Sequence, residues 1–180
     1  MAIPEVLTPR LHLRAWDDER TTALAALQAD AEIMRFIGAG PVDAERTAEL
    51  VEEWTARWER DGFSLWAACD RTTGECIGRT GVTRHPYWES PEVGWLFAKR
   101  SWGRGLATEA GRASVRFGFE VVGLDRIISV CRPENQRSEH VMRKLGMVHD
   151  RDDVHPTLGV AVRVYAIERE AWGATAAAGC

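Results

Sequence analysis

The run Arg100–Ala107 (RSWGRGLA) contains two glycines, Gly103 and Gly105, at the point where a strand pattern gives way to a helix pattern. The first amides of a helix have no partner within the helix and lie at the positive end of its dipole, so they attract anions. Glycine lacks the Cβ atom that would keep a phosphate away from the backbone, and it readily adopts positive φ. The spacing therefore predicts a backbone cradle for a pyrophosphate group.

The charge around this run also favours an anionic ligand. Five basic residues and one acidic residue lie between Lys99 and Arg116, although the net charge of the whole chain is -4. No Lys-Ser/Thr pair follows the second glycine, and Thr108 stands where a dinucleotide fingerprint needs a third glycine. These features disfavour ATP and NAD loops, and the alternative to a phosphate cradle is a tight turn that binds nothing.

Two blocks of the chain resemble one enzyme superfamily. Arg100, Gly103 and Gly105 match the Q/R-x-x-G-x-G/A signature of the GNAT superfamily of acyl-CoA-dependent N-acyltransferases. Asn135, Ser138 and the ending Lys144–Met147 (KLGM) resemble its branch that acetylates the N-terminal alanine or serine of ribosomal proteins. The resemblance covers essentially the whole chain, and it implies acetyl-CoA as co-substrate and a primary amine as acceptor.

The resemblance also implies how acetyl-CoA would be held. In the family, the strand before the glycine loop splays from its neighbour, and its main-chain N–H groups bind the pantetheine arm and the thioester oxygen; here those residues are Trp95, Leu96, Phe97 and Ala98. The pyrophosphate would bind the loop residues Arg100, Gly103, Arg104, Gly105, Leu106 and Ala107. Asn135 matches a position that meets the cofactor arm or an ordered water, and its alternative role is a helix N-cap. Lys99 stands near the place of the family's usual proline, so the resemblance does not predict the backbone geometry at the start of the loop.

Glu92 and Ser138 are the candidate catalytic residues. Transfer of an acyl group from a thioester to an amine needs the ammonium deprotonated and the departing thiolate protonated or stabilised. Glu92 matches a glutamate of the family branch, so we expect a general base that acts directly or through water; the alternative is a strand-edge carboxylate. Many superfamily members place a tyrosine where Met142 stands, which leaves Ser138 to protonate the thiolate, with a solvated serine as its alternative.

A sheet must position these residues, and hydrophobic periodicity predicts its elements. Strands are expected at Leu11–Ala15, Phe63–Cys69, Cys76–Thr83, Glu92–Ala98, Arg126–Cys131, Met147–Asp152 and Val160–Glu168. Helices are expected from about Asp18, from the Gly38–Pro41 break to about Arg60, over Leu106–Val121 and over Gln136–Leu145. The interleaving predicts a mixed α/β (α+β) fold. The resemblance implies a mostly antiparallel sheet of about seven strands, with flanking helices and a splayed central strand pair.

The composition is typical of one compact cytoplasmic domain, expected over residues 1–172 with a flexible tail at 173–180. The chain has 180 residues, of which 45% are hydrophobic and 28% are charged. No apolar stretch approaches the roughly 20 residues that span a bilayer, and no export signal is recognisable. The four cysteines (Cys69, Cys76, Cys131 and Cys180) stand singly, so neither a zinc site nor a disulfide framework is expected.

Other features of the chain set expectations for partners. His149, Asp150, Asp152, Asp153 and His155 are of metal-binding type, but the expected mechanism needs no metal and we expect none. Outside the cofactor region no basic face is present, so nucleic-acid binding is not expected. The first 62 residues have a net charge of -6, which would attract a cationic amine or form an ordinary solvated surface. The resemblance also allows a homodimer.

The acceptor stays open at this point. A protein N-terminal α-amine competes with small amines such as aminoglycosides, polyamines or amino-acid derivatives, because one scaffold serves all of them. The loops Ile33–Pro41 and Asp150–Thr157 would border the acceptor groove, and His85, Tyr87 and Trp88 either contact the acceptor or only shape a turn. The alternative of another class is a non-catalytic acyl-CoA-binding sensor, against which the presence of Glu92 and Ser138 argues.

Overall fold

The computed structural model describes residues 2–177, and eight strands in that range form one sheet. The strands are β1 (Val6–Leu7), β2 (Leu11–Arg14), β3 (Leu65–Asp70), β4 (Cys76–Thr83), β5 (Glu92–Phe97), β6 (Arg126–Cys131), β7 (Val148–Val154) and β8 (Ala161–Glu168). Their order is β1-β2-β3-β4-β5-β6-β8-β7, and every neighbouring pair is antiparallel except β5 and β6. The sheet thus consists of two antiparallel halves joined by one parallel contact.

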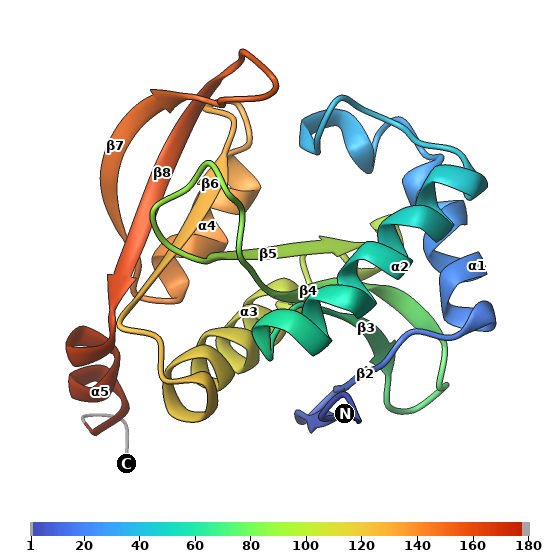
Figure 1. Ribbon diagram of the computed structural model, residues 1–180, viewed down its shortest axis with the longest axis horizontal. Coiled ribbons are helices and arrows are strands. Elements are labelled where there is room, and N and C mark those ends of the chain that lie inside the picture. Colours follow the sequence, from blue (N-terminus) through green and yellow to red (C-terminus); the bar gives the residue numbers. More distant parts are fainter. Residues whose placement is uncertain (1, 178–180) are drawn as a thin grey trace.

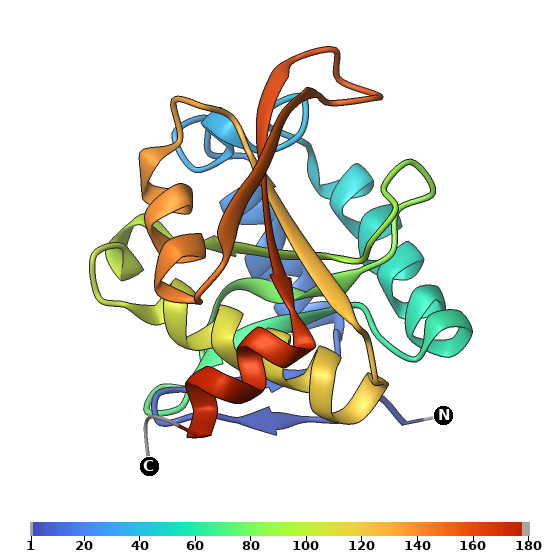
Figure 2. The ribbon, with the colours of Figure 1, turned by 90° about the vertical axis from the view of Figure 1, so that its left-hand side faces the viewer.

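Helices cover both faces of the first half of the sheet (Figures 1 and 2). The helices are α1 (Asp18–Gln28), α2 (Ala44–Asp61), α3 (Leu106–Phe117), α4 (Gln136–Lys144) and α5 (Arg169–Ala177), with the short turns η1 (Met34–Phe36), η2 (Lys99–Ser101) and η3 (Gly118–Val122). Leu96 of β5 packs in one cluster with Leu24 of α1 and Trp54 of α2. The preceding residue, Trp95, lies against Gly111 of α3, and a Cβ added to Gly111 would come within 3.3 Å of the Trp95 ring. Because side chains alternate along a strand, α1 and α2 lie on one face and α3 on the other.

The two halves of the sheet separate beyond the start of β5. Glu92 pairs with Ile128 of β6, and the contact is completed by Ile128 N donating to Pro91 O at 2.9 Å and by Ser129 Oγ donating to Val93 O at 2.9 Å. Figure 1 shows β6 and β8 running steeply away from β5. The predicted splayed pair is therefore present, and it opens the edge of β5 after Val93.

The predicted fold class is confirmed, with small differences at the ends of elements. The two-residue strand β1 was not expected, because two residues are too few to form a period-2 pattern. The helix expected to Val121 is α-helical to Phe117 and continues as the π-turn η3. Helix α5 reaches Ala177, within the segment expected to be a tail, whereas residues 178–180, including Cys180, lie outside the described residues. None of the helices in the described range is long and apolar enough to span a membrane.

Candidate active site

A cavity of about 160 Å³ lies where β5 and β6 diverge. It brings together Glu92, Asn135 and Ser138, which the sequence predicts to act in catalysis and cofactor binding. Both loops expected to border an acceptor also contribute, through Ile37 on one side and His155 on the other. The remaining wall residues include Phe36, Gly38, Arg79, Val93, Gly94, Trp95, Ser129, Val130, Cys131, Arg132, Leu158, Val160 and Val162.

Glu92 is the first residue of β5, and its side chain is only 20% exposed. Burial raises the pKa of this carboxyl from 4.5 to about 7, and the positive charge of Arg79 and the indole of Trp88 oppose the rise. The His85 Nε2 atom lies 3.6 Å from Glu92 Oε2, but burial lowers the pKa of His85 to about 4, so this imidazole is neutral at pH 7. A carboxyl with a pKa near neutral pH is suited to accept a proton from an ammonium group.

Aromatic rings of the loop 84–91 shield Glu92 from water. His85 hydrogen-bonds to Thr83 Oγ1 at 3.0 Å and to the Tyr87 hydroxyl at 3.2 Å, and its ring stacks on Tyr87. The rings of Tyr87 and Trp88 lie 5.4 and 5.8 Å from that of His155 in the β7–β8 loop. Trp88 is buried against β6 and β8, and its Nε1 forms no hydrogen bond of ordinary geometry with the described residues. The pKa of Glu92 is raised by its burial beside these rings, although the indole of Trp88 itself opposes the rise.

Asn135 and Ser138 lie at the beginning of α4, on the opposite wall. Asn135 is the N-cap residue, and its Oδ1 accepts a hydrogen bond from Ser138 N at 3.2 Å. The capping role therefore occupies its carbonyl oxygen, while the residue still lines the cavity. Ser138 Oγ has no hydrogen-bond partner among the residues described, so its hydroxyl is available to a ligand.

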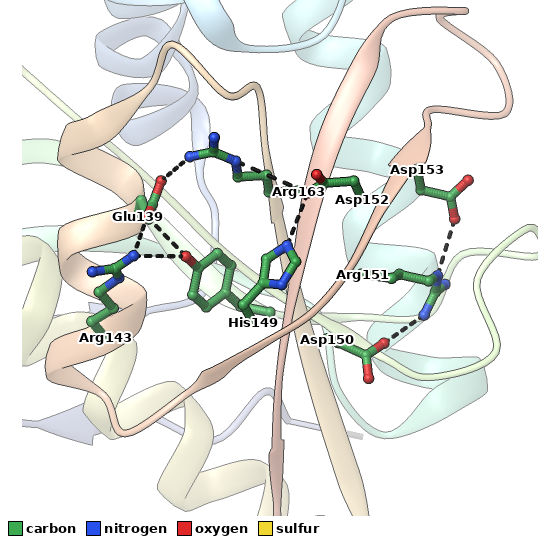
Figure 3. A network of polar contacts seen from close by, with 9 residues as sticks. Glu139, Arg143, His149, Asp150, Arg151, Asp152, Asp153 and Arg163 are labelled. Atoms are coloured by element: carbon green, nitrogen blue, oxygen red, sulfur yellow. Dashed lines mark hydrogen bonds and ion pairs between the residues drawn. The ribbon is translucent and has the colours of Figure 1, made fainter.

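Glu139 fixes α4 against the C-terminal strands (Figure 3). Its carboxylate accepts hydrogen bonds from the Tyr165 hydroxyl at 2.8 Å, from Arg163 at 2.8 Å and from Arg143 at 2.6 Å. These hydrogen bonds lower the pKa of Glu139, and the bond from Tyr165 has the largest effect. The ionised network orients the first turn of α4 and with it the neighbouring Ser138.

The glycine loop has the backbone conformation that the sequence predicts. Gly103 and Gly105 have φ values of +72° and +77°, in the left-handed region that favours glycine. A Cβ at Gly103 would meet no atom within 4 Å, and one at Gly105 would meet only Arg10 Nη2 at 3.6 Å, so the space beside the loop is open. No side chain caps α3, which leaves the amides of Leu106–Thr108 without a described partner. An anionic group fits this cradle.

The cations around the loop have different partners. Arg100 forms an ion pair with Glu75 at the β3–β4 turn. Lys99 pairs with Asp30 at 2.9 Å and Glu32 at 3.1 Å, and so ties the start of the loop to the connection after α1. The side chain of Arg104 is exposed and has no ion pair in the described part of the chain. Arg104 is therefore the loop cation most available to a ligand.

Arg10 stabilises the glycine loop through hydrogen bonds, and no sequence motif indicated this role. Its Nη1 donates to Arg104 O at 2.7 Å, and its Nε donates to Glu109 Oε2 at 2.7 Å. Thr8 Oγ1 donates to Glu109 Oε1 at 2.6 Å. These partners are 94 to 101 residues apart in the chain, so no local pattern could have indicated them.

The N–H groups of β5 point alternately toward β4 and toward the splay between β5 and β6. Ala98 N donates to Ile77 O of β4 at 2.8 Å, and in an antiparallel ladder the N–H groups two residues apart point the same way. The N–H of Leu96 is thus also directed at β4, whereas those of Trp95 and Phe97 open toward the splay. Of the four residues expected to bind the cofactor through N–H groups, only Trp95 and Phe97 have them directed at the splay between β5 and β6.

The acidic residues near the C-terminal hairpin are held by cations (Figure 3). Arg151 pairs with Asp150 at 2.7 Å and with Asp153 at 3.1 Å, and His149 contacts Asp152 at 2.8 Å. Across residues 2–177, no three His, Cys, Asp or Glu side chains are grouped so that they could hold a metal ion.

Residues 10–148 match the family described as acetyltransferase (GNAT) domain. The chain is 33% identical over 151 residues to the uncharacterized protein YkkB of Bacillus subtilis. This alignment covers 82% of this chain and 87% of YkkB. It is 28% identical over 187 residues to the FsC-acetyl coenzyme A-N(2)-transacetylase of Aspergillus fumigatus, covering 95% of this chain and 79% of that protein.

A solved structure has the same fold. The acetyltransferase from Agrobacterium tumefaciens superposes with a TM-score of 0.83 at 28% sequence identity, covering 93% of this chain and 96% of the other. The similarity therefore extends over nearly the whole chain.

Proposed function

The chain belongs to the GNAT family of acetyltransferases, and on that premise we propose that it transfers an acetyl group from acetyl-CoA to the nitrogen of a primary amine. The observation that carries the proposal is that Glu92, Ser138 and the open edge of β5 meet at one cavity, near an uncapped helix N-terminus. When bound, acetyl-CoA supplies a thioester carbonyl that an amine can attack.

The chain offers two backbone sites for the cofactor. The amides of Gly103, Gly105 and Leu106–Thr108 would hold the pyrophosphate, with Arg104 adding a positive charge. The N–H groups of Trp95 and Phe97 would hold the pantetheine arm and orient the thioester oxygen. Both sites are built from main chain in a defined conformation, so they need little rearrangement to bind.

Glu92 is the proposed general base. Because the pKa of Glu92 is about 7, a large share of the protein molecules carry an ionised Glu92 near neutral pH. The ionised carboxylate can take a proton from the acceptor ammonium directly or through a water molecule. The neutral His85 beside it does not compete for that role, because its own pKa is about 4. The base is therefore the carboxylate, and the imidazole helps to enclose it.

Ser138 is the proposed donor to the departing sulfur. Its hydroxyl has no partner among the described side chains and lines the cavity opposite Glu92. A serine hydroxyl is a weak acid, so its contribution is a hydrogen bond to the developing thiolate at the positive end of α4.

Substituting Ser138 by alanine should lower kcat by about 10-fold to 100-fold, the loss expected for one hydrogen bond to a charged group. The cap of α4 uses the backbone N–H of this residue, so the substitution should leave the melting temperature almost unchanged. Thiol release gives kcat, and calorimetric CoA binding should match that of the wild type. A kcat within twofold of the wild-type value would remove Ser138 from the mechanism.

The acceptor is a small amine in this proposal. The cavity is about 160 Å³, and the loop residues Ile37 and His155 line it. A protein N-terminal α-amine, which the sequence resemblance favours, is the second candidate.

Gly94 lines this cavity and offers a steric test of the acceptor site. It has no positive φ, and a Cβ placed on it would meet no atom within 4 Å. Gly94→Val should therefore fold normally but fill the acceptor space, lowering kcat/KM for the amine at least about 10-fold. Gly94→Ala should cause a smaller loss. Equal kcat/KM for all three proteins would place the acceptor elsewhere.

The function itself is tested by thiol release from acetyl-CoA with a panel of N-terminal peptides, aminoglycosides, polyamines and amino acids. Calorimetric CoA binding is measured in parallel. Turnover of one class supports the proposal and identifies the acceptor. CoA binding with no turnover of any amine would favour the sensor, and no CoA binding would overturn the cofactor assignment.

A further inference from the structure

Arg79 projects from β4 into the cavity without an anionic partner. Its Nε is buried and has no hydrogen-bond partner among the described residues. The guanidinium instead lies over the ring of Trp54, 5.2 Å from its centroid, and no carboxylate of the described residues forms an ion pair with it. A guanidinium stays charged and carries five N–H donors, and leaving a buried donor such as this Nε without an acceptor is unfavourable. Arg79 therefore offers the cavity a cation that can bind an anionic group.

Arg79 and Glu92 share one face of the sheet. The β4–β5 register pairs Arg79 with Leu96, Gly81 with Gly94, and Thr83 with Glu92, so all six residues lie on the same face. The backbones of Arg79 and Glu92 are about 13 Å apart at 3.3 Å per strand residue. Between them, Gly94 lines the cavity, and an added Cβ there would meet no atom within 4 Å, whereas the backbone of Ser64 closes off Gly81. A ligand can lie over Gly94 with one end toward each charged group.

We propose that Arg79 determines acceptor specificity and that the acceptor is a small primary amine carrying a carboxylate, as in a free amino acid. This inference rests on the proposed function. The carboxylate would accept two parallel hydrogen bonds from the planar guanidinium, and the amine would lie toward Glu92.

The size and charge of the cavity support this class of acceptor. Its volume of about 160 Å³ is enough to hold several water molecules, which suits a small amino acid. A protein N-terminus has a neutral peptide group in place of the carboxylate and would leave Arg79 unpaired. Glu92 is reserved for proton transfer and lies beyond ion-pair distance, so it does not supply the missing anion.

The test compares matched acceptors. For each of several L-amino acids, kcat/KM is measured by thiol release alongside the corresponding amino-acid amide and the decarboxylated amine. We expect the carboxylate form to be preferred over its amide by about 10-fold to 100-fold. This comparison needs only the wild-type protein, so it does not depend on the folding of a variant.

Variants of Arg79 then assign the preference to this residue. Arg79→Gln should reduce the acid-to-amide ratio to within threefold of unity, and Arg79→Lys, which keeps the charge but not the planar fork, should give an intermediate ratio. Arg57→Gln is the matched control, because Arg57 lies on α2 near His85 but outside the cavity wall. Its ratio should equal that of the wild type.

A second readout separates binding from a structural role. Arg79 lowers the pKa of Glu92, so Arg79→Gln should move the acidic limb of the kcat/KM profile to higher pH for the amide acceptor. CoA binding should stay unchanged in the same variant.

The outcomes are distinguishable. Equal turnover of acids and amides, or an acid preference that survives in Arg79→Gln, would overturn the inference and leave the proposed acetyltransferase standing. Failure of every amine to react while CoA still binds would overturn both.

Discussion

Replacing Glu92 by glutamine will lower kcat by about 10²-fold to 10⁴-fold, the usual contribution of a positioned general base. Glutamine keeps the shape of the side chain but cannot accept the ammonium proton. In the wild-type protein, kcat/KM should rise with pH and level off above a midpoint near 7, because Glu92 must be ionised to act. Thiol release measured from pH 5.5 to 9 gives both results.

The same substitution should stabilise the protein at alkaline pH. The pKa of Glu92 is about 7 in the folded protein and 4.5 ordinarily, so between these values the folded state binds more protons than the unfolded state. The free energy of unfolding therefore falls as pH rises through this window, by roughly 3 kcal/mol in total. Glu92→Gln removes that dependence, and urea unfolding at pH 5 and pH 8 measures it.

Glu89→Gln is the control for both effects. Glu89 lies three residues earlier in the same loop and is exposed, so its substitution should change neither kcat nor the pH dependence of unfolding. A Glu92→Gln protein with a kcat within threefold of the wild type would show that another group takes the proton.

Replacing Gly105 by valine will weaken CoA binding by about 100-fold or more. Valine is strained at a φ of +77°, and its branched side chain would project into the open space beside the loop. Each hydrogen bond from an amide to a charged phosphate contributes about 1.5–3 kcal/mol, so the loss of one or two accounts for the change. Calorimetric titration with CoA measures it.

Gly62→Val separates backbone strain from lost binding. Gly62 also has a φ of +77° and no atom within 4 Å of an added Cβ, but it ends α2 away from the loop. Both variants should lose about 1–3 kcal/mol of stability, and only Gly105→Val should lose CoA affinity. Equal CoA affinity in the two variants would contradict the assignment of the loop.

Local features of the chain were predictable because local chemistry determines them. The alternation of β5 and the positive φ of Gly103 and Gly105 follow from side-chain period and from the absence of a Cβ. The N-cap at Asn135 was recognisable for the same reason, since the cap involves only the next three residues. The short strand β1 and the extent of α5 depend on packing and were not predictable from a pattern.

The sequence alone thus determined the family, the order of elements, and the presence of Glu92 and Ser138 as candidates. Only the tertiary structure decided what surrounds them: the burial that raises the pKa of Glu92, the hydrogen bond from Arg10 to the glycine loop, and the place of Arg79 at the cavity with no ion pair to it within residues 2–177. Periodicity reports neighbours within one element, whereas burial and charge pairing arise between elements distant in the chain, and these set proton affinity and specificity.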